Sequence, residues 1–161
     1  IQKKVRRAKR KGDIVVASIH WGSNWGYGIA SKQRVFSHRL IDEADVDLIH
    51  GHSSHHVKAI EVYKDKLILY GCGDFINDYE GIGGYEEFRA DLSLMYFATV
   101  EPSTGKLLGL QMTPTKVRRF KVIRASNVDT LWLKDTLNRE GTSFGTHVIA
   151  GKDNRLSLQW D

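Results

Sequence analysis

Histidine is the residue type whose placement in this 161-residue sequence could do chemistry. Five of the seven histidines fall in two places: His20 follows the apolar run DIVVASI, and four more lie in the segment IHGHSSHH. Neutral imidazole, the main form near physiological pH, offers a ring nitrogen to zinc, manganese or iron. Because parallel strands bring their carboxyl ends to one edge of a sheet, the two groups could converge on one ion.

Each histidine also has a structural interpretation. For His20 this alternative stays open, since the ring could simply pack beside Trp21. The cluster of four is interpreted as functional, because a core rarely holds that many titratable rings. Within the cluster we expect His50 to be a packed residue at the end of its strand. His38 is expected to lie on the surface of a helix, and His147 to be structural.

Other polar candidates lie after a later strand, in the segment GCGDFINDYEGIGG. Asp74, Asn77 and Asp78 could serve there as ligands, as bases or as loop caps, and loop caps are the favoured interpretation. Glu61 lies inside an expected strand, where it either faces solvent or orients a ligand histidine. The sequence has no G-x-S-x-G nucleophile elbow, no P-loop and no dinucleotide-binding fingerprint.

The elements that must position these residues follow from hydrophobic periodicity and from turn and cap signals. Ser126 and Asp129 form a capping box at the start of the last helix. One helix is expected to end at Gly12, and two more are expected over 32–43 and 126–140. The expected strands span 13–19, 46–50, 59–63, 66–71, 92–100, 106–113 and 117–123. A terminal hairpin is expected around 151–154. An α/β start therefore leads into an antiparallel sheet, and residues 1–161 are expected to form a single domain.

Charge is concentrated at one end of the chain. Residues 1–11 hold seven lysines and arginines and no acid, so removing them from the net charge of +5 leaves −2. A solvated helix face is the favoured interpretation, with a polyanion contact as the alternative. Nucleic acid is not an expected partner, because a nucleic-acid reader spreads its cations along a binding face. No apolar run approaches the ~20 residues of a membrane helix, so no membrane span is expected.

The segments VVASIHWG and VDLIHGHSSHHVKAIEVYKDKLILYGCGDF resemble the C-terminal half of the CapA family, the poly-gamma-glutamate capsule biosynthesis proteins, which belong to the calcineurin-like metallophosphatase superfamily. The similarity continues to DTLNREGTSFGTHV and covers nearly the whole chain. It implies an α/β fold, a metallophosphatase-like sandwich of two sheets flanked by helices. It also implies that this chain holds only part of that fold and that the N-terminal half is a further partner.

The resemblance also implies a site. His20 matches the family's histidine after a strand, and His52 and His55 match its paired loop histidines, with His56 in reserve. These two are separated by two serines, whereas the superfamily pattern has one residue there. The implied metal ligands are His20, His52 and His55, the implied catalytic residues are His20 and His55, and the implied cofactor is a divalent Mn, Zn or Fe ion. The superfamily's metal-bridging aspartate and asparagine-histidine pair have no counterpart ahead of Asp13, so we expect an incomplete site.

Two functional hypotheses follow. The first is a metal-dependent hydrolase that acts on poly-gamma-glutamate or on another substrate with a phosphate or amide bond. The alternative is a non-catalytic, polyanion-binding component of a polymer synthesis or export apparatus. On the metal-site hypothesis the rings of His20, His52 and His55 should approach one pocket, and Trp21, Trp25 and Tyr27 should wall the same cleft.

Overall fold

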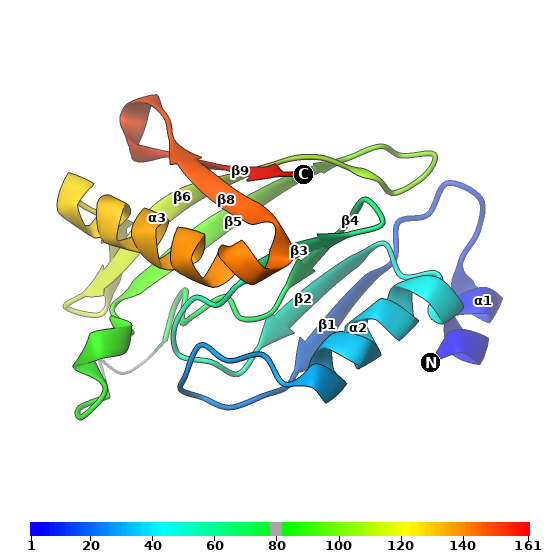
Figure 1. Ribbon diagram of the computed structural model, residues 1–161, viewed down its shortest axis with the longest axis horizontal. Coiled ribbons are helices and arrows are strands. Elements are labelled where there is room, and N and C mark those ends of the chain that lie inside the picture. The colour runs from blue at the N-terminus through cyan, green and yellow to red at the C-terminus, as the bar shows by residue number, and fades with distance from the viewer. Residues whose placement is uncertain (78–81) are drawn as a thin grey trace.

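The computed structural model spans residues 1–161 and describes all of them except 78–81. Within the described part the chain forms two β-sheets and three α-helices, which confirms the expected α/β class (Figure 1). The helices are α1 (Gln2–Ala8), α2 (Ser31–Ala44) and α3 (Asn127–Gly141). Short 3-10 turns lie at Glu86–Phe88, Thr142–Phe144 and Lys152–Asn154.

The first sheet has four strands, and three of them run parallel. Its order is β1 (Val16–His20), β2 (Leu48–His52), β4 (Lys66–Leu69) and β3 (Ile60–Tyr63), with β3 antiparallel to β4. One face of this sheet is covered by α2, whose Leu40, Ile41 and Ala44 pack in a cluster with Ile49 and Ile68. The carboxyl ends of β1 and β2 therefore lie side by side, as the sequence predicted.

The second sheet is antiparallel. Its order is β5 (Leu92–Val100), β6 (Leu107–Arg118), β9 (Leu156–Trp160) and β8 (Thr146–Ala150), and β7 (Lys121–Arg124) also pairs with β6. One core cluster joins this sheet to β3, β4 and α3. The two sheets are also linked directly, because the Thr146 hydroxyl donates to the Ile60 carbonyl at 2.8 Å.

The helices are placed less symmetrically than a sandwich flanked on both sides would require. α2 covers the outer face of the first sheet, whereas α3 lies beside β3 and packs into the core between the layers (Figure 1). The Ser126 side chain accepts a hydrogen bond from the Asp129 N–H, which confirms Ser126 as the N-cap. The Asp129 carboxylate accepts from the Ser126 hydroxyl at 2.8 Å, in place of the bond to the Ser126 backbone N–H that a full capping box would have. No helix in the described part of the chain is long and apolar enough to cross a membrane.

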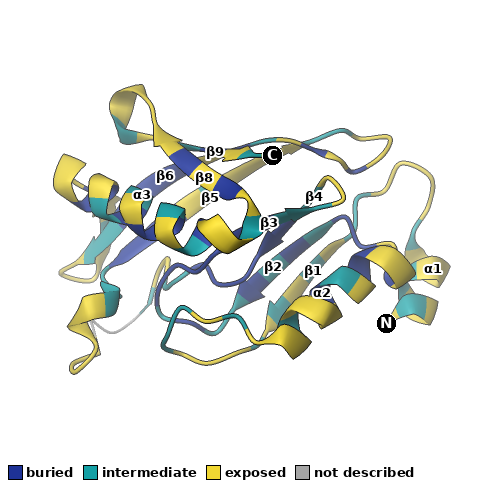
Figure 2. Cartoon of the chain, in the orientation of Figure 1, coloured by how far each residue is buried: buried dark blue, intermediate teal, exposed yellow. Residues whose placement is uncertain are grey.

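Burial on the first sheet falls steeply from β4 to β1. Leu67 and Leu69 of β4 are 1% and 4% exposed, whereas Val16 of β1 is 55% exposed (Figure 2). The continuous apolar run around β1 predicts a strand buried on both faces, and that prediction is wrong for the face that carries Val16, Ser18 and His20, all exposed. The second sheet does not extend over this part of the first one.

Candidate functional site

His20 and His52 lie next to each other at the carboxyl ends of β1 and β2. The two residues are register partners in the parallel ladder, so their side chains point to the same face. Their ring centroids are 5.3 Å apart in an edge-on arrangement. His20 is exposed and His52 is partly exposed. The expectation that two strands deliver histidines to one place is confirmed for this pair.

His50 belongs to the same face, which the sequence interpretation missed. It lies two residues before His52 on β2, and its ring centroid is 5.5 Å from that of His52. Its Nδ1 atom is 3.0 Å from the Ser18 hydroxyl of β1. Partial burial and the neighbouring His52 lower the pKa of His50 below its ordinary value. The period-2 alternation of a strand was the available signal, since positions 50 and 52 must share a face.

His55 lies in the loop after β2 and contacts a carboxylate from the segment after β4. Its Nδ1 atom lies 2.8 Å from Asp74 Oδ2, and its backbone N–H donates to the Asn24 carbonyl at 3.1 Å. The Asn77 amide also donates to Asp74, at 3.4 Å. Asp74 therefore orients a histidine in this structure, a role that the loop-cap interpretation did not foresee. Asp78, the remaining candidate of that loop, lies outside the described residues.

His56 is a core residue. It is 1% exposed, and its Nδ1 atom donates to the Val57 carbonyl at 2.9 Å. Phe88, Trp25 and Tyr27 surround the ring at centroid distances of 4.7, 6.1 and 4.8 Å. Burial lowers the pKa of His56 to about 4, so the ring is neutral near physiological pH. This environment removes His56 from the candidates for an accessible ligand.

Two of the three expected aromatic wall residues lie beside the histidine loop. Trp25 contacts His55 at a centroid distance of 5.2 Å and stacks on Tyr85 at 4.2 Å. Tyr27 contacts His56 rather than His55. Trp21 packs elsewhere: its Nε1 atom donates to the Tyr70 carbonyl at 3.1 Å and its ring belongs to the α2 side of the sheet. The expectation for Trp21 was wrong, because its position next to His20 in β-geometry places it on the opposite face.

Glu61 is buried and serves a different histidine from the one expected. Arg34 and His38 of α2 both lie 3.0 Å from its Oε1 atom, and the Tyr70 hydroxyl donates to Oε2 at 2.6 Å. The carboxylate is 3% exposed, so the solvent-facing alternative is wrong. His38 stacks on Tyr63 and lies on the α2 side of the first sheet, away from the face of His20 and His52. Glu61 therefore ties α2 to the sheet.

A divalent ion needs several convergent ligands, and the described residues supply only part of such a set. His20 and His52 offer two adjacent imidazoles, the donor type that suits zinc, manganese and iron. Among residues 1–77 and 82–161, no group of three or more His, Cys, Asp or Glu side chains has the arrangement of a metal site. The two imidazoles of His20 and His52 are fewer ligands than the four of a tetrahedral zinc site.

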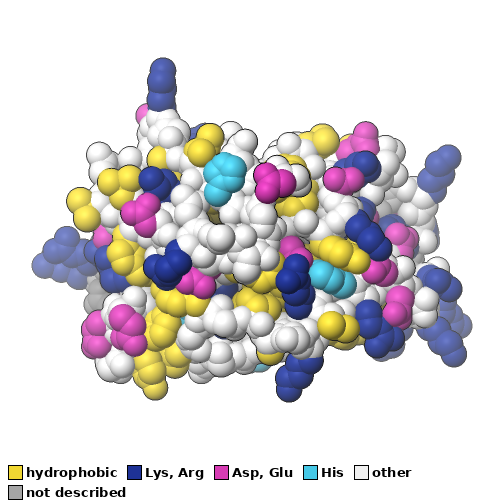
Figure 3. Space-filling view, in the orientation of Figure 1, with side chains coloured by type: hydrophobic (Ala, Val, Ile, Leu, Met, Phe, Trp, Pro, Cys, Tyr) yellow, Lys and Arg dark blue, Asp and Glu magenta, His cyan; other side chains and the backbone are white. Residues whose placement is uncertain are grey.

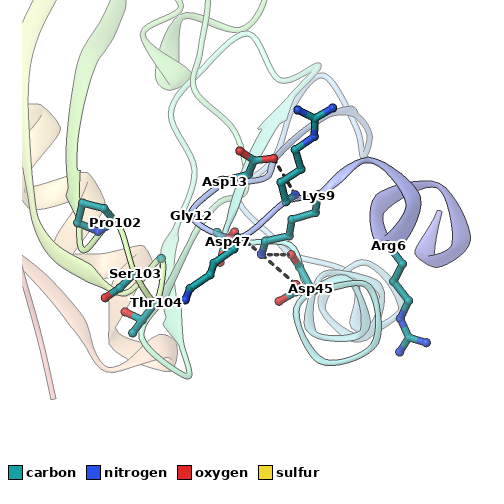
Figure 4. A pocket seen from close by; sticks show the side chains of 12 residues that line it. Arg6, Lys9, Gly12, Asp13, Asp45, Asp47, Pro102, Ser103 and Thr104 are labelled. Carbon is teal, nitrogen blue, oxygen red and sulfur yellow. Dashed lines mark hydrogen bonds and ion pairs between the residues drawn. The ribbon is translucent and has the colours of Figure 1, made fainter.

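The basic N-terminal segment lies against the other end of the strands. Lys9 donates to Asp47 at 2.8 Å and to the Asp45 backbone carbonyl at 3.0 Å, in a cleft that Arg6 of α1 and Thr104 of the β5–β6 turn also line (Figure 4). Lys66 also binds Asp47, at 2.6 Å. Burial alone would raise the pKa of Asp47, but the two lysines hold it below its ordinary value. Lys9 is thus structural, and the other cations of α1 face solvent.

Comparison with known proteins relates the chain to one family. The model of the bacterial capsule synthesis protein family PGA_cap matches residues 1–79. A probable polyglutamine synthesis accessory protein of Mycobacterium tuberculosis is 52% identical over 150 residues, which cover 93% of this chain and 39% of that protein. Over these residues the chain is similar to the PGA_cap family. The PGA biosynthesis protein CapA of Bacillus subtilis is 31% identical over 157 residues, which cover 98% of this chain and 38% of that protein.

Other family members match a shorter region. The capsule biosynthesis protein CapA of Bacillus anthracis is 34% identical over 80 residues, or 47% of this chain. The resemblance to CapA proteins that the histidine motifs indicated is thereby confirmed. The chain spans about two fifths of the length of the Mycobacterium tuberculosis and Bacillus subtilis relatives, 39% and 38%.

Proposed function

We propose that this chain supplies the histidine-bearing part of a metallophosphatase-type, metal-dependent hydrolase site within a longer capsule-synthesis protein. The observation that carries the proposal is the pairing of His20 with His52, whose rings lie 5.3 Å apart at the ends of adjacent parallel strands. A core would not place two such rings on an open face of a sheet. The loop that follows β2 in the chain carries a further histidine, His55, which contacts Asp74.

The proposed roles follow from the surroundings of each ring. His20 and His52 would hold a divalent Mn, Zn or Fe ion, and His55 would be a third ligand. When bound, such an ion lowers the pKa of a water toward ~7 and neutralises charge on the leaving oxygen. His20 and His55 are the proposed catalytic residues. Asp74 would fix the ring orientation of His55 through Nδ1, as carboxylates commonly do for ligand histidines.

The remaining ligands would come from the part of the protein beyond these residues. The open face around Val16, Ser18 and His20 is where such a part would pack. The proposed substrate carries an amide or a phosphate ester, and poly-gamma-glutamate is the specific candidate, because one relative is named a PGA biosynthesis protein.

The test is metal content and hydrolysis in the intact protein. We expect His52→Ala and His20→Ala to lose bound transition metal, measured by elemental analysis, and to lose hydrolysis of a chromogenic phosphodiester and of a gamma-glutamyl anilide by 10²-fold or more, about the scale of removing one key catalytic group. His147→Ala, which removes an exposed histidine of β8, is the matched control. Unchanged metal and unchanged hydrolysis in both site variants would reject the proposal.

A second candidate is a non-catalytic polyanion-binding role, favoured by the exposed cations of α1. Lys3, Lys4, Arg6 and Arg7 all face solvent within or beside a short helix that has no acid. Replacing these four by Gln should weaken binding to poly-gamma-glutamate and reduce its salt dependence. Binding that is insensitive to salt, or that survives the fourfold variant, would reject this role while leaving the hydrolase proposal intact.

A further inference from the structure

The hairpin between β6 and β7 projects from the second sheet. We define the tip hairpin as residues 116–124. β6 pairs with β5 only as far as Lys116, which lies opposite Leu92. Beyond that point the one strand that pairs with β6 in the described part of the chain is β7, through Val117↔Val122 and Arg118↔Lys121. The tip is therefore a two-stranded ribbon, in which Val117 and Val122 are half-buried and residues 118–121 are exposed.

The tip hairpin is strongly basic. It holds five cations and no acid: Lys116, Arg118, Arg119, Lys121 and Arg124. Lys116 is neutralised by Asp91 and Asp129, at 3.2 and 3.4 Å. Among the described residues, Arg118, Lys121 and Arg124 have no carboxylate partner, and all three are exposed. Basic side chains project from this end of the molecule as well as from the end that carries α1 (Figure 3). The end with the tip hairpin thus carries uncompensated positive charge.

An aromatic ring lies at the turn of this basic ribbon. Phe120 is 64% exposed, and Ile123 of β7 is 42% exposed. Arg119 and Phe120 both have left-handed backbone, with φ of 51° and 57°. Two-residue turns of this kind favour Asn-Gly, and a bulky residue there costs on the order of 1 kcal/mol. Neither folding nor solubility explains an exposed phenylalanine at a position where glycine would be more stable.

We infer that the tip hairpin docks on an anionic lipid surface. Cations that lack carboxylate partners attract acidic headgroups, and an exposed ring between them enters the headgroup and acyl boundary. The combination separates this hairpin from α1, which carries cations but no aromatic residue. A soluble polyanion would bind the basic side chains alone. The Phe120 ring contributes binding free energy only where it can leave water for an apolar phase.

Vesicle co-sedimentation of the intact protein tests the inference. The probes are phosphatidylcholine vesicles with and without phosphatidylglycerol. We expect binding only to the anionic vesicles, about fivefold weaker for each cation removed in Arg118→Gln and Lys121→Gln. Phe120→Ser should weaken binding roughly fivefold at unchanged charge. The matched control is Leu108→Ser at the opposite end of β6, because Leu108 is 62% exposed. The control for charge is Arg7→Gln in α1.

Tryptophan fluorescence tests the same inference without a co-sedimentation step. Phe120→Trp should show a blue shift of its emission on anionic vesicles, and brominated lipid should quench it. Absence of vesicle binding would overturn the inference, and so would equal weakening by Leu108→Ser and Phe120→Ser. Binding to soluble poly-gamma-glutamate that Phe120→Ser leaves unchanged, with no binding to vesicles, would identify the hairpin as a polyanion contact instead.

Discussion

The two halves of the first sheet present the same strand face to very different surroundings. On β4, Leu67 and Leu69 point toward the second sheet and are buried. On β1, Val16, Ser18 and His20 point the same way, in register through β2, and are exposed. The strands have similar lengths and the same parallel pairing. Burial on this face is therefore set by how far the second sheet extends over it.

The difference teaches where polar chemistry can be placed on a sheet. Leucines occupy the inner face where another layer covers it, and Ser18, His20, His50 and His52 occupy it where the layer stops. On an uncovered face an imidazole can keep water or a ligand as a hydrogen-bond partner, so placing it there costs little desolvation free energy. We refer to these two parts as the covered half and the open half.

The largest expected effect compares a truncation in each half. Leu67→Ala in the covered half should lower the free energy of unfolding by about 2 to 5 kcal/mol, because it leaves a cavity in the joint core. Val16→Ala in the open half should change it by roughly 0.5 kcal/mol or less, since the side chain already lies in water. Urea denaturation followed by circular dichroism measures both. Equal losses would show that the open half is covered in solution.

The dependence of stability on pH extends the comparison to His56, the buried histidine in the loop after β2. Its pKa of about 4 lies below the ordinary ~6.5, so the unfolded chain binds the proton more tightly. The contribution of neutral His56 to the free energy of unfolding is fully present above about pH 6.5. It is lost as the pH falls toward 4, by up to about 3 kcal/mol. His56→Phe should flatten the unfolding curve over this range. A slope that persists in His56→Phe, or one that vanishes equally in His20→Asn, would contradict this assignment.

The smallest effect concerns the histidines of the open half themselves. Partial burial and the proximity of His52 hold the pKa of His50 below its ordinary value. Removing the neighbour in His52→Ala should therefore raise the pKa of His50, a shift that proton NMR titration of the imidazole resonances resolves. Ser18→Ala, which removes the hydroxyl at 3.0 Å from His50, tests the other contact. An unchanged or lower pKa in His52→Ala would show that the two rings do not interact in solution.

Much of the element order could be predicted from the sequence, because the signals are local. The strand over Leu92–Val100 and the helix capped by Ser126 were expected at those bounds or within one residue of them. Separate strands were expected over 106–113 and 117–123, whereas β6 runs from Leu107 to Arg118, with Pro114 opposite Leu94, and the chain turns before β7. The parallel pairing of β1 with β2 was expected from the helix between them, whereas the parallel pairing of β2 with β4 was not predicted.

The site could be predicted only in part, because its members depend on contacts between distant segments. The pairing of His20 with His52 followed from the ends of two strands. The contact between His55 and Asp74 joins two loops whose residues are 19 positions apart, and no rule of sequence spacing predicts it. Glu61 was misjudged for a similar reason, since its partners Arg34 and His38 come from a helix that packs on the sheet only after folding.

The outer position of β1 also bears on how this stretch of chain behaves by itself. β1 ends its sheet, and no described strand pairs with its far side. The segment from Ile14 to Ile19 carries no charge and is rich in β-branched residues. Natural edge strands are blunted by charges, prolines or bulges, because an unprotected edge recruits the backbone of another molecule. Solutions of residues 1–161 alone are therefore expected to form aggregates seeded at this strand, and a lysine at position 16 or 18 is the change that should keep them dispersed.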